Sequence, residues 1–195
     1  MSYNLLMKKI YIIHGWSGAS NADWIGWAGD AFKEKGYEVV VPDMPDTDNP
    51  QIKPWVDYLS SLVTDINSNT YFIGHSIGCQ TIMRFLEKAD KQAGGAIFVA
   101  AWFNLVNLES KESEDIAEPW IKTPIDLEKV KKNLKQSIVI LGDNDKWVPY
   151  LETKKDFESK LGSKAVTIKN GGHITSDENF GPFPQLVKVF EENFK

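Results

Sequence analysis

Residues 71–83, "YFIGHSIGCQTIM", place a serine between two glycines where a buried strand is predicted to run into a helix. Side chains two residues away on either side of such a sharp bend would collide, so glycine suits Gly74 and Gly78. The hydroxyl of Ser76 would then be exposed, and the Ile77 amide would be placed to donate to a developing oxyanion. The bare Gly-x-Ser-x-Gly pattern is common by chance, but its strand-to-helix context makes Ser76 a candidate nucleophile.

A nucleophilic serine needs a base, and the chain offers three histidines. His75 is next to the serine, and the sharp turn should direct its side chain elsewhere. His14 begins "HGWSG" directly after the first predicted strand, where the amide of Trp16 is our choice for the second oxyanion donor. His173 lies in "NGGHIT" after the last predicted strand, on a glycine-containing loop that can carry the imidazole over the sheet edge. We therefore predict that His173 is the general base.

The acid that orients the base is expected between the serine and the histidine. "LGDNDKWVP" offers Asp143 and Asp145 after another predicted strand, and we choose Asp145 because it lies deeper in the loop. The Asp-Asn-Asp spacing also occurs in calcium loops, but these continue with a further ligand, a glycine and a late glutamate. Here Lys146 and Trp147 follow, so we predict no metal and no other cofactor.

Short runs rich in β-branched and aromatic residues alternate with helical patterns. Strands are predicted at 10–13, 38–41, 70–73, 96–99, 138–141 and 165–168. Apolar residues at helical spacing occupy 24–32, 55–66, 157–161 and 186–190, and Gly36 is a predicted helix stop. This alternation predicts an α/β fold, a mostly parallel sheet with helices on both faces.

Size and charge narrow the class of protein. A chain of 195 residues is expected to form one domain, residues 1–195, and its net charge of −5 argues against a nucleic-acid partner. No apolar run approaches the ~20 residues of a membrane span, and the start of the chain does not resemble a signal peptide. With a single cysteine, no internal disulfide is possible. We expect a cytoplasmic protein that acts on a small molecule, without membrane association.

Two features bear on the substrate pocket. The stretch 104–136 is the least regular part of the chain, and its acidic centre, "ESKESEDIAEP", predicts a solvated loop or, alternatively, a small flap near a pocket. Trp16, Trp102 and Trp147 each follow a predicted strand end, where they either join the core or wall an apolar acyl pocket. A polar stretch is poorly suited to form a hydrophobic roof, so we expect a shallow pocket for short acyl groups.

Taken together, "IYIIHGWSG", "VVVPDMPDTDNP" followed by Trp55, "YFIGHSIGCQTIM", "LGDNDKWVP" and "NGGHIT" resemble the small serine hydrolases grouped with retinoblastoma-binding protein 9 and YdeN-type bacterial proteins. The resemblance covers nearly the whole chain. It implies a three-layer α/β-hydrolase fold with a six-stranded parallel sheet of order 2-1-3-4-5-6 and no large cap. It also places Ser76, Asp145 and His173 at the triad positions of the family.

The predicted function is hydrolysis of small acyl esters through a Ser-His-Asp triad and an acyl-enzyme. A thioesterase, an amidase or an acyltransferase would use the same residues, and these alternatives stay open. A protein of another class, a largely inactive hydrolase-fold binding protein, is disfavoured by the complete set of catalytic residue types. Cys79 follows Ser76 within the helix, where a small residue packs in the core more often than it serves as a reactive thiol.

Overall fold

A computed structural model describes residues 7–194 of the chain. Residues 1–6, which belong to the start that we interpret as lacking a signal peptide, lie outside the described residues. Among the described residues, no helix is both long enough and apolar enough to cross a membrane.

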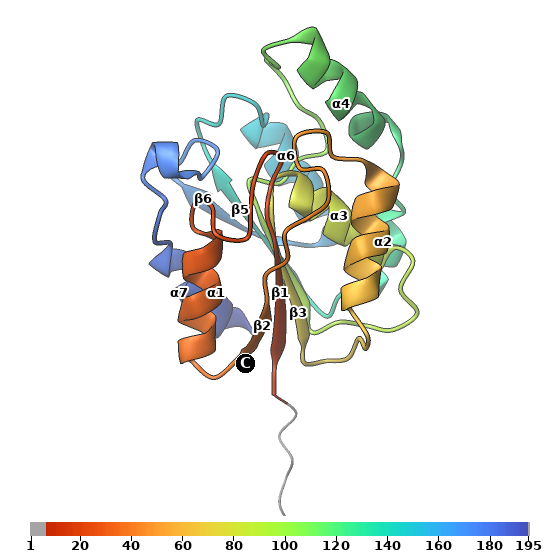
Figure 1. The fold of residues 1–195 in the computed structure, drawn as a ribbon, viewed down its shortest axis with the longest axis vertical. Coiled ribbons are helices and arrows are strands. Elements are labelled where there is room, and N and C mark those ends of the chain that lie inside the picture. The colour runs from red at the N-terminus through yellow and green to blue at the C-terminus, as the bar shows by residue number, and fades with distance from the viewer. Residues whose placement is uncertain (1–6, 195) are drawn as a thin grey trace, which may run out of the picture.

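The centre of the molecule is a six-stranded parallel sheet in the order β2-β1-β3-β4-β5-β6, which confirms the predicted topology (Figure 1). Its strands are β1 (Lys9–Ile13), β2 (Glu38–Val40), β3 (Thr70–His75), β4 (Gly95–Val99), β5 (Ser137–Gly142) and β6 (Lys164–Ile168). All six predicted strands are present. The main difference is that β3 continues two residues further than predicted, to the residue directly before Ser76.

The sheet is covered on both faces because its strands are apolar on both faces. In β1, Ile10 and Ile12 join one buried cluster, whereas Tyr11 and Ile13 join the other. Successive side chains of a strand point to opposite faces of the sheet, so alternate residues of β1 enter the two cores on its two sides. The edge strands β2 and β6 are less buried than the central four.

Helices complete the two outer layers. Helices α1 (Ile25–Glu34) and α7 (Pro184–Asn193) cover one face, and α2 (Ile52–Leu62), α3 (Ile77–Leu86) and α5 (Leu127–Lys132) cover the other (Figure 1). Helix α6 (Tyr150–Asp156) continues into a π-helical turn. The predicted second helix ends earlier than expected, since Val63 and Ile66 lie beyond it, although both remain buried.

The prediction that the stretch 104–136 is a solvated loop was wrong. It contains α4 (Lys111–Lys122), which stands at the top of Figure 1, and α5. Helix α4 begins with a cap, because the Ser110 hydroxyl accepts a hydrogen bond from the Ser113 amide at 3.0 Å. Only Ala117 and Trp120 are buried, so the apolar signal was too sparse to reveal a helix.

The other end of α4 is tied to α3. Arg84, near the end of α3, donates from its guanidinium to the carbonyl oxygens of Trp120 at 2.9 Å and Thr123 at 2.7 Å. Carbonyls in the last turn of a helix have no partner within the helix, so this side chain supplies one. These two hydrogen bonds hold the C-terminal end of α4 against α3.

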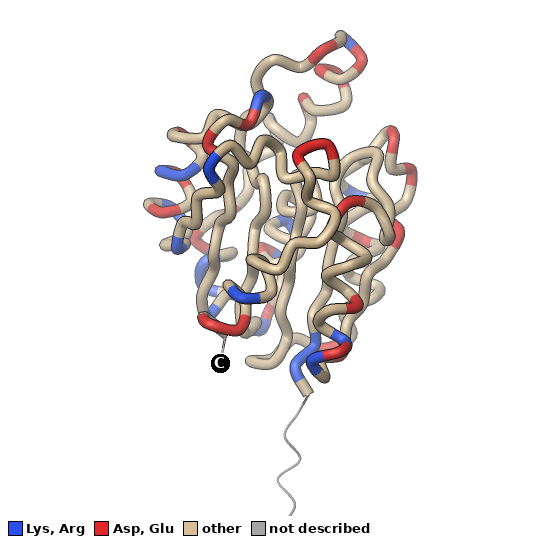
Figure 2. The backbone as a smooth tube through the Cα atoms, turned by 90° about the vertical axis from the view of Figure 1, so that its left-hand side faces the viewer, with Lys and Arg blue, Asp and Glu red and all other residues tan. Residues whose placement is uncertain are grey.

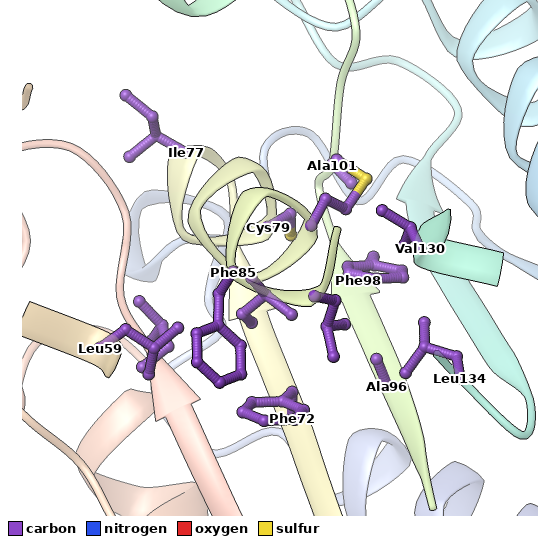
Figure 3. Close-up of a cluster of buried hydrophobic side chains, with 14 of the residues drawn as sticks. Leu59, Phe72, Ile77, Cys79, Phe85, Ala96, Phe98, Ala101, Val130 and Leu134 are labelled. Carbon is purple, nitrogen blue, oxygen red and sulfur yellow. The ribbon is translucent and has the colours of Figure 1, made fainter. Parts of the chain in front are cut away.

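Charged residues do not form one basic face in the view of Figure 2, where Lys and Arg are interspersed with Asp and Glu. Figure 3 shows the core between α3 and the sheet, with Cys79 among Phe72, Phe85 and Phe98. The Cys79 thiol is fully buried and donates to the Val99 carbonyl oxygen at 3.4 Å, and burial raises its pKa well above the ordinary value. The interpretation of Cys79 as core packing is confirmed.

Candidate active site

Ser76 occupies a strained bend between β3 and α3. Its φ of +51° lies in a region that residues other than glycine rarely adopt, and such outliers cluster at functional sites. A Cβ atom on Gly74 would lie 2.8 Å from the Cys79 nitrogen, and one on Gly78 would lie 2.5 Å from the Ile13 carbonyl oxygen. Both obstacles are backbone atoms, so glycine is required at the two positions for the bend to form.

The close approach at Gly78 also brings the first loop beside the serine. The first turn of α3 packs against the end of β1, and the loop at 14–18 lies next to Ser76. A Cβ atom on Gly15 would be 3.4 Å from the Ser76 Cβ. The loop closes on itself, because the Gly18 amide donates to the Gly15 carbonyl at 3.2 Å. Trp16 lies between these two residues, and its amide is one of the two oxyanion donors that we predict.

The structure brings the predicted base and acid together. The Nδ1 atom of His173 donates to Oδ2 of Asp145 at 2.6 Å. Asp145 lies in the acid loop, residues 143–148, and its Oδ1 accepts from the amides of Trp147 at 2.9 Å and Val148 at 3.1 Å. Burial by itself would raise the pKa of the Asp145 carboxyl, but these hydrogen bonds outweigh it and lower that pKa.

The acid loop also fixes the backbone of the base loop, residues 170–176. The Asn170 amide donates to the Asp143 carboxylate at 2.7 Å, and the Gly172 amide donates to the Asn144 side-chain oxygen at 2.8 Å. Of the two candidate acids, Asp143 therefore holds main chain and does not pair with the imidazole. Three consecutive side chains of the acid loop each accept one hydrogen bond from the base loop.

The other two histidines are buried, and their ring nitrogens bond to main-chain atoms. His14 donates from Nδ1 to the Gly15 carbonyl at 2.8 Å and accepts from the Met44 amide at Nε2, at 2.9 Å. His75 does not pair with Asp145: its Nε2 donates to the His173 carbonyl at 2.9 Å, although the residue also lines the cavity. Burial lowers the pKa of both imidazoles, that of His75 to about 4, so both are neutral near pH 7.

Serine, base and loop meet at one cavity of about 310 Å³. Trp16 and Trp147 line it, as predicted, and the Trp147 ring meets the His173 ring edge-on at 5.0 Å between centroids. The other lining residues come mainly from the first loop, the start of α1 and the segment 105–113. They are His14, Gly15, Ser17, Gly18, Ala22, Asp23, Ile25, His75, Ser76, Leu105, Leu108, Glu109, Ser113, His173 and Thr175.

Trp102 does not form a wall of this cavity, which corrects the expectation for that residue. Its side chain is only 1% exposed, and its indole N–H points to the Ser76 hydroxyl oxygen at 3.4 Å from within the protein. The reason is local: Ala100 has a φ of +46°, and the Trp102 carbonyl is held by the Gln80 side chain at 2.9 Å. The chain therefore turns into the core directly after β4.

The roof loop, residues 104–110, is a part of the site that the sequence indicated only through the alternative of a small flap near a pocket. Leu105, Leu108 and Glu109 line the cavity, although this stretch was expected to be too polar to cover it. The roof loop is fixed to the acid loop, because the Val106 amide donates to the Trp147 carbonyl at 2.8 Å. The apolar residues in "NLVNLES", just before the acidic run, were the signal that would have identified it.

The described residues contain no group of three or more His, Cys, Asp or Glu side chains arranged to hold a metal ion. What the arrangement offers is a hydroxyl at a bend, an imidazole oriented by a carboxylate, and amides at a helix start and an adjacent loop. These are the groups that nucleophilic acyl chemistry requires.

Comparison with known proteins agrees with this chemistry. YdeN of Bacillus subtilis (strain 168), described as a hydrolase, is 29% identical over 191 residues, which is 97% of each chain. Its crystal structure matches with a TM-score of 0.86 at 28% identity and covers 95% of this chain and 98% of that chain.

A more distant solved structure shares the fold. Est1E from Butyrivibrio proteoclasticus, solved with ferulic acid bound, matches with a TM-score of 0.72 at 18% identity, covering 96% of this chain and 89% of that chain.

The sequence model for the family described as serine hydrolase matches residues 10–192. The chain therefore belongs to the serine hydrolase family, and YdeN is a relative along almost its whole length.

Proposed function

We propose that this hydrolase cleaves esters of small acyl groups through a triad of Ser76, His173 and Asp145 and a covalent acyl-enzyme. One observation carries the proposal. The His173 imidazole, paired with Asp145 at 2.6 Å, lines the same cavity as the hydroxyl-bearing bend at Ser76. Ser76 follows β3, Asp145 follows β5 and His173 follows β6, so all three lie at one edge of the sheet.

In the first half of the reaction, Ser76 Oγ attacks the ester carbonyl carbon while its proton passes to Nε2 of His173. Asp145 holds the Nδ1 proton in place, so Nε2 is left as the acceptor, and its negative charge stabilises the imidazolium that forms. Collapse of the tetrahedral intermediate breaks the bond to the alcohol, which leaves with the proton from Nε2. The acyl group is then bonded to Ser76.

In the second half, a water molecule takes the place of the alcohol. His173 removes its proton as the oxygen attacks the acyl carbon, and returns that proton to Ser76 Oγ when the acid is released. In both halves the negative oxygen of the tetrahedral species accepts hydrogen bonds from the amides of Trp16 and Ile77. The Ile77 amide begins α3, where the helix leaves amides without internal partners and the dipole favours negative charge.

The proposed substrate is a small molecule, because the cavity of about 310 Å³ is at the lower end of the range for small-molecule sites. Hydrolysis of thioesters or amides, and acyl transfer to another alcohol, would use the same residues. Measuring kcat/KM on an ester, a thioester and an amide with the same acyl group would show which reaction is preferred. Turnover is expected to persist in the presence of EDTA, because every step uses groups of the chain itself.

Labelling with a fluorophosphonate tests the proposal. The expected result is one phosphonylated residue, Ser76, located by mass spectrometry, and loss of ester hydrolysis in Ser76→Ala by roughly four to six orders of magnitude. Ser113→Ala is the matched control, since Ser113 also lines the cavity and should leave labelling intact. Labelling at another residue, or an active Ser76→Ala, would contradict the triad.

A further inference from the structure

The residue after the proposed base has a strained backbone. Ile174 has a φ of +57°, a region that strongly disfavours a β-branched side chain. Its side chain is fully buried in the core between the sheet, α1 and α7. Strain of this kind persists only where the surroundings enforce it.

Two buried rings contact the main chain on both sides of this residue. The Nε2 atom of His75 donates to the carbonyl oxygen of His173 at 2.9 Å. The indole Nε1 of Trp24 donates to the carbonyl oxygen of Ile174 at 3.0 Å. The carbonyl groups before and after the strained Cα are therefore each held by a hydrogen bond from a ring nitrogen.

These two donors are themselves well fixed. Trp24 is 0% exposed and His75 is 4% exposed, and their rings meet edge-on at 5.7 Å between centroids. The Trp24 ring also packs edge-on against Phe183. With its pKa near 4, His75 is neutral at pH 7 and carries one ring proton, which belongs on Nε2 because that atom faces a carbonyl oxygen.

We propose that Trp24 and His75 are positioning residues for the base, which hold the strained main chain at 173–174 and thereby aim the His173 imidazole. The direction of a side chain follows from the backbone that carries it, so release of either carbonyl lets the loop relax towards an ordinary φ. The imidazole then turns away from Asp145 and Ser76. This inference rests on the proposed function, because it assigns the two rings to the same triad.

The test compares variants that lose one ring donor with variants that keep it. Trp24→Phe removes the N–H and keeps an aromatic ring against Phe183. His75→Phe removes the second donor, whereas His75→Gln retains an N–H near the position of Nε2. Trp120→Phe is the matched control: its indole is equally buried and donates to the Pro50 carbonyl at 2.8 Å, away from the base loop.

Two readouts are needed. The first is kcat and KM for a short acyl ester, and the second is the low-field proton resonance of the His173 Nδ1–H bonded to Asp145. We expect Trp24→Phe and His75→Phe to lower kcat about 10- to 100-fold with little change in KM, as misplaced catalytic groups do. The low-field resonance should weaken or shift in both variants. His75→Gln should stay within about threefold of the parent protein, and Trp120→Phe should change neither readout.

A kcat for Trp24→Phe and His75→Phe equal to that of Trp120→Phe, with the resonance unchanged, would overturn the inference. So would a loss of activity that only tracks the fraction of folded protein. If His75→Phe does not fold, Trp24→Phe decides alone, because it preserves the ring packing. Failure of the triad itself is recognised separately: the parent protein would then not be labelled by a fluorophosphonate, whereas the resonance reports on the His173–Asp145 pair without turnover.

Discussion

Nδ1 of His173 and Oδ2 of Asp145 are 2.6 Å apart, and the side chain of Asp145 is only 2% exposed. The other carboxylate oxygen is occupied by two backbone amides, so the carboxylate cannot turn away from the imidazole without losing them. This fixes the tautomer of His173 with its proton on Nδ1 and its lone pair on Nε2.

Replacement of the acid tests that relationship. Asp145→Asn should reduce kcat steeply, by up to ~10⁴ on the precedent of serine proteases, because the amide presents the wrong hydrogen-bonding partner to Nδ1. Asp143→Asn is the control, since it keeps an oxygen acceptor for the Asn170 amide and should cost much less. Steady-state kinetics of the pair decides the matter. A larger loss for Asp143→Asn would move the acid role to that residue.

Acyl chain length should be limited by the roof loop. We expect kcat/KM to be highest for acetyl to butyryl esters and to fall by octanoyl, because Leu105 and Leu108 close a cavity of about 310 Å³. Each further methylene then gains well under the ~0.8 kcal/mol of full burial. Leu108→Ala should shift the optimum to longer chains. Val106→Ala, in the same loop but exposed, is the control, and a steady rise to palmitoyl esters in the parent protein would refute the limit.

The glycine after the serine should be intolerant of any side chain. In Gly78→Ala the new Cβ would lie 2.5 Å from the Ile13 carbonyl oxygen and 2.6 Å from that of His14. Neither backbone atom can move freely, so we expect a loss of about 1–3 kcal/mol in the free energy of unfolding, together with lower kcat as Ser76 shifts. Gly181→Ala, where the Cβ meets nothing within 4 Å, should leave urea unfolding unchanged. Equal stability of the two variants would disprove the steric account.

Stability should fall in mild acid because of His75. Its pKa is lowered from 6.5 to about 4 in the folded protein, so the unfolded chain binds a proton more readily between these values. The stabilisation is complete above about pH 6.5 and is lost as the pH falls towards 4, with a limit of roughly 3 kcal/mol. Urea unfolding across this range should show the loss, and His75→Gln should reduce it. An identical pH dependence in His75→Gln would assign the effect to other groups.

The sequence predicted what local pattern and residue type determine. Continuous apolar runs predicted the four central strands because central parallel strands are buried on both faces, and β-branched residues marked the less buried edge strands β2 and β6. The glycines around Ser76 marked the bend because two backbone contacts leave no space for a Cβ. The choice of Asp145 over Asp143 agrees with the observed pairing with His173, while its catalytic role stays a prediction.

What the sequence could not reveal depends on contacts between distant parts of the chain. Helix α4 is held by two buried side chains and by Arg84, so its own apolar pattern was too weak to predict it. Trp102 follows a strand just as Trp147 does, but the positive φ of Ala100 and the hydrogen bond from Gln80 to the Trp102 carbonyl accompany its turn into the core. The pairing of Trp24 with the Ile174 carbonyl joins residues 150 positions apart, which no local pattern encodes.

The acid loop has a consequence for engineering. One side of it accepts three hydrogen bonds from the base loop, and its Lys146 and Trp147 carbonyls accept hydrogen bonds from the roof loop. Catalytic geometry and substrate preference therefore share one short stretch of chain. A chimera that imports only the roof of another hydrolase would disturb the acid along with the specificity. The transferable unit comprises all three segments, 104–110, 143–148 and 170–176, moved as one.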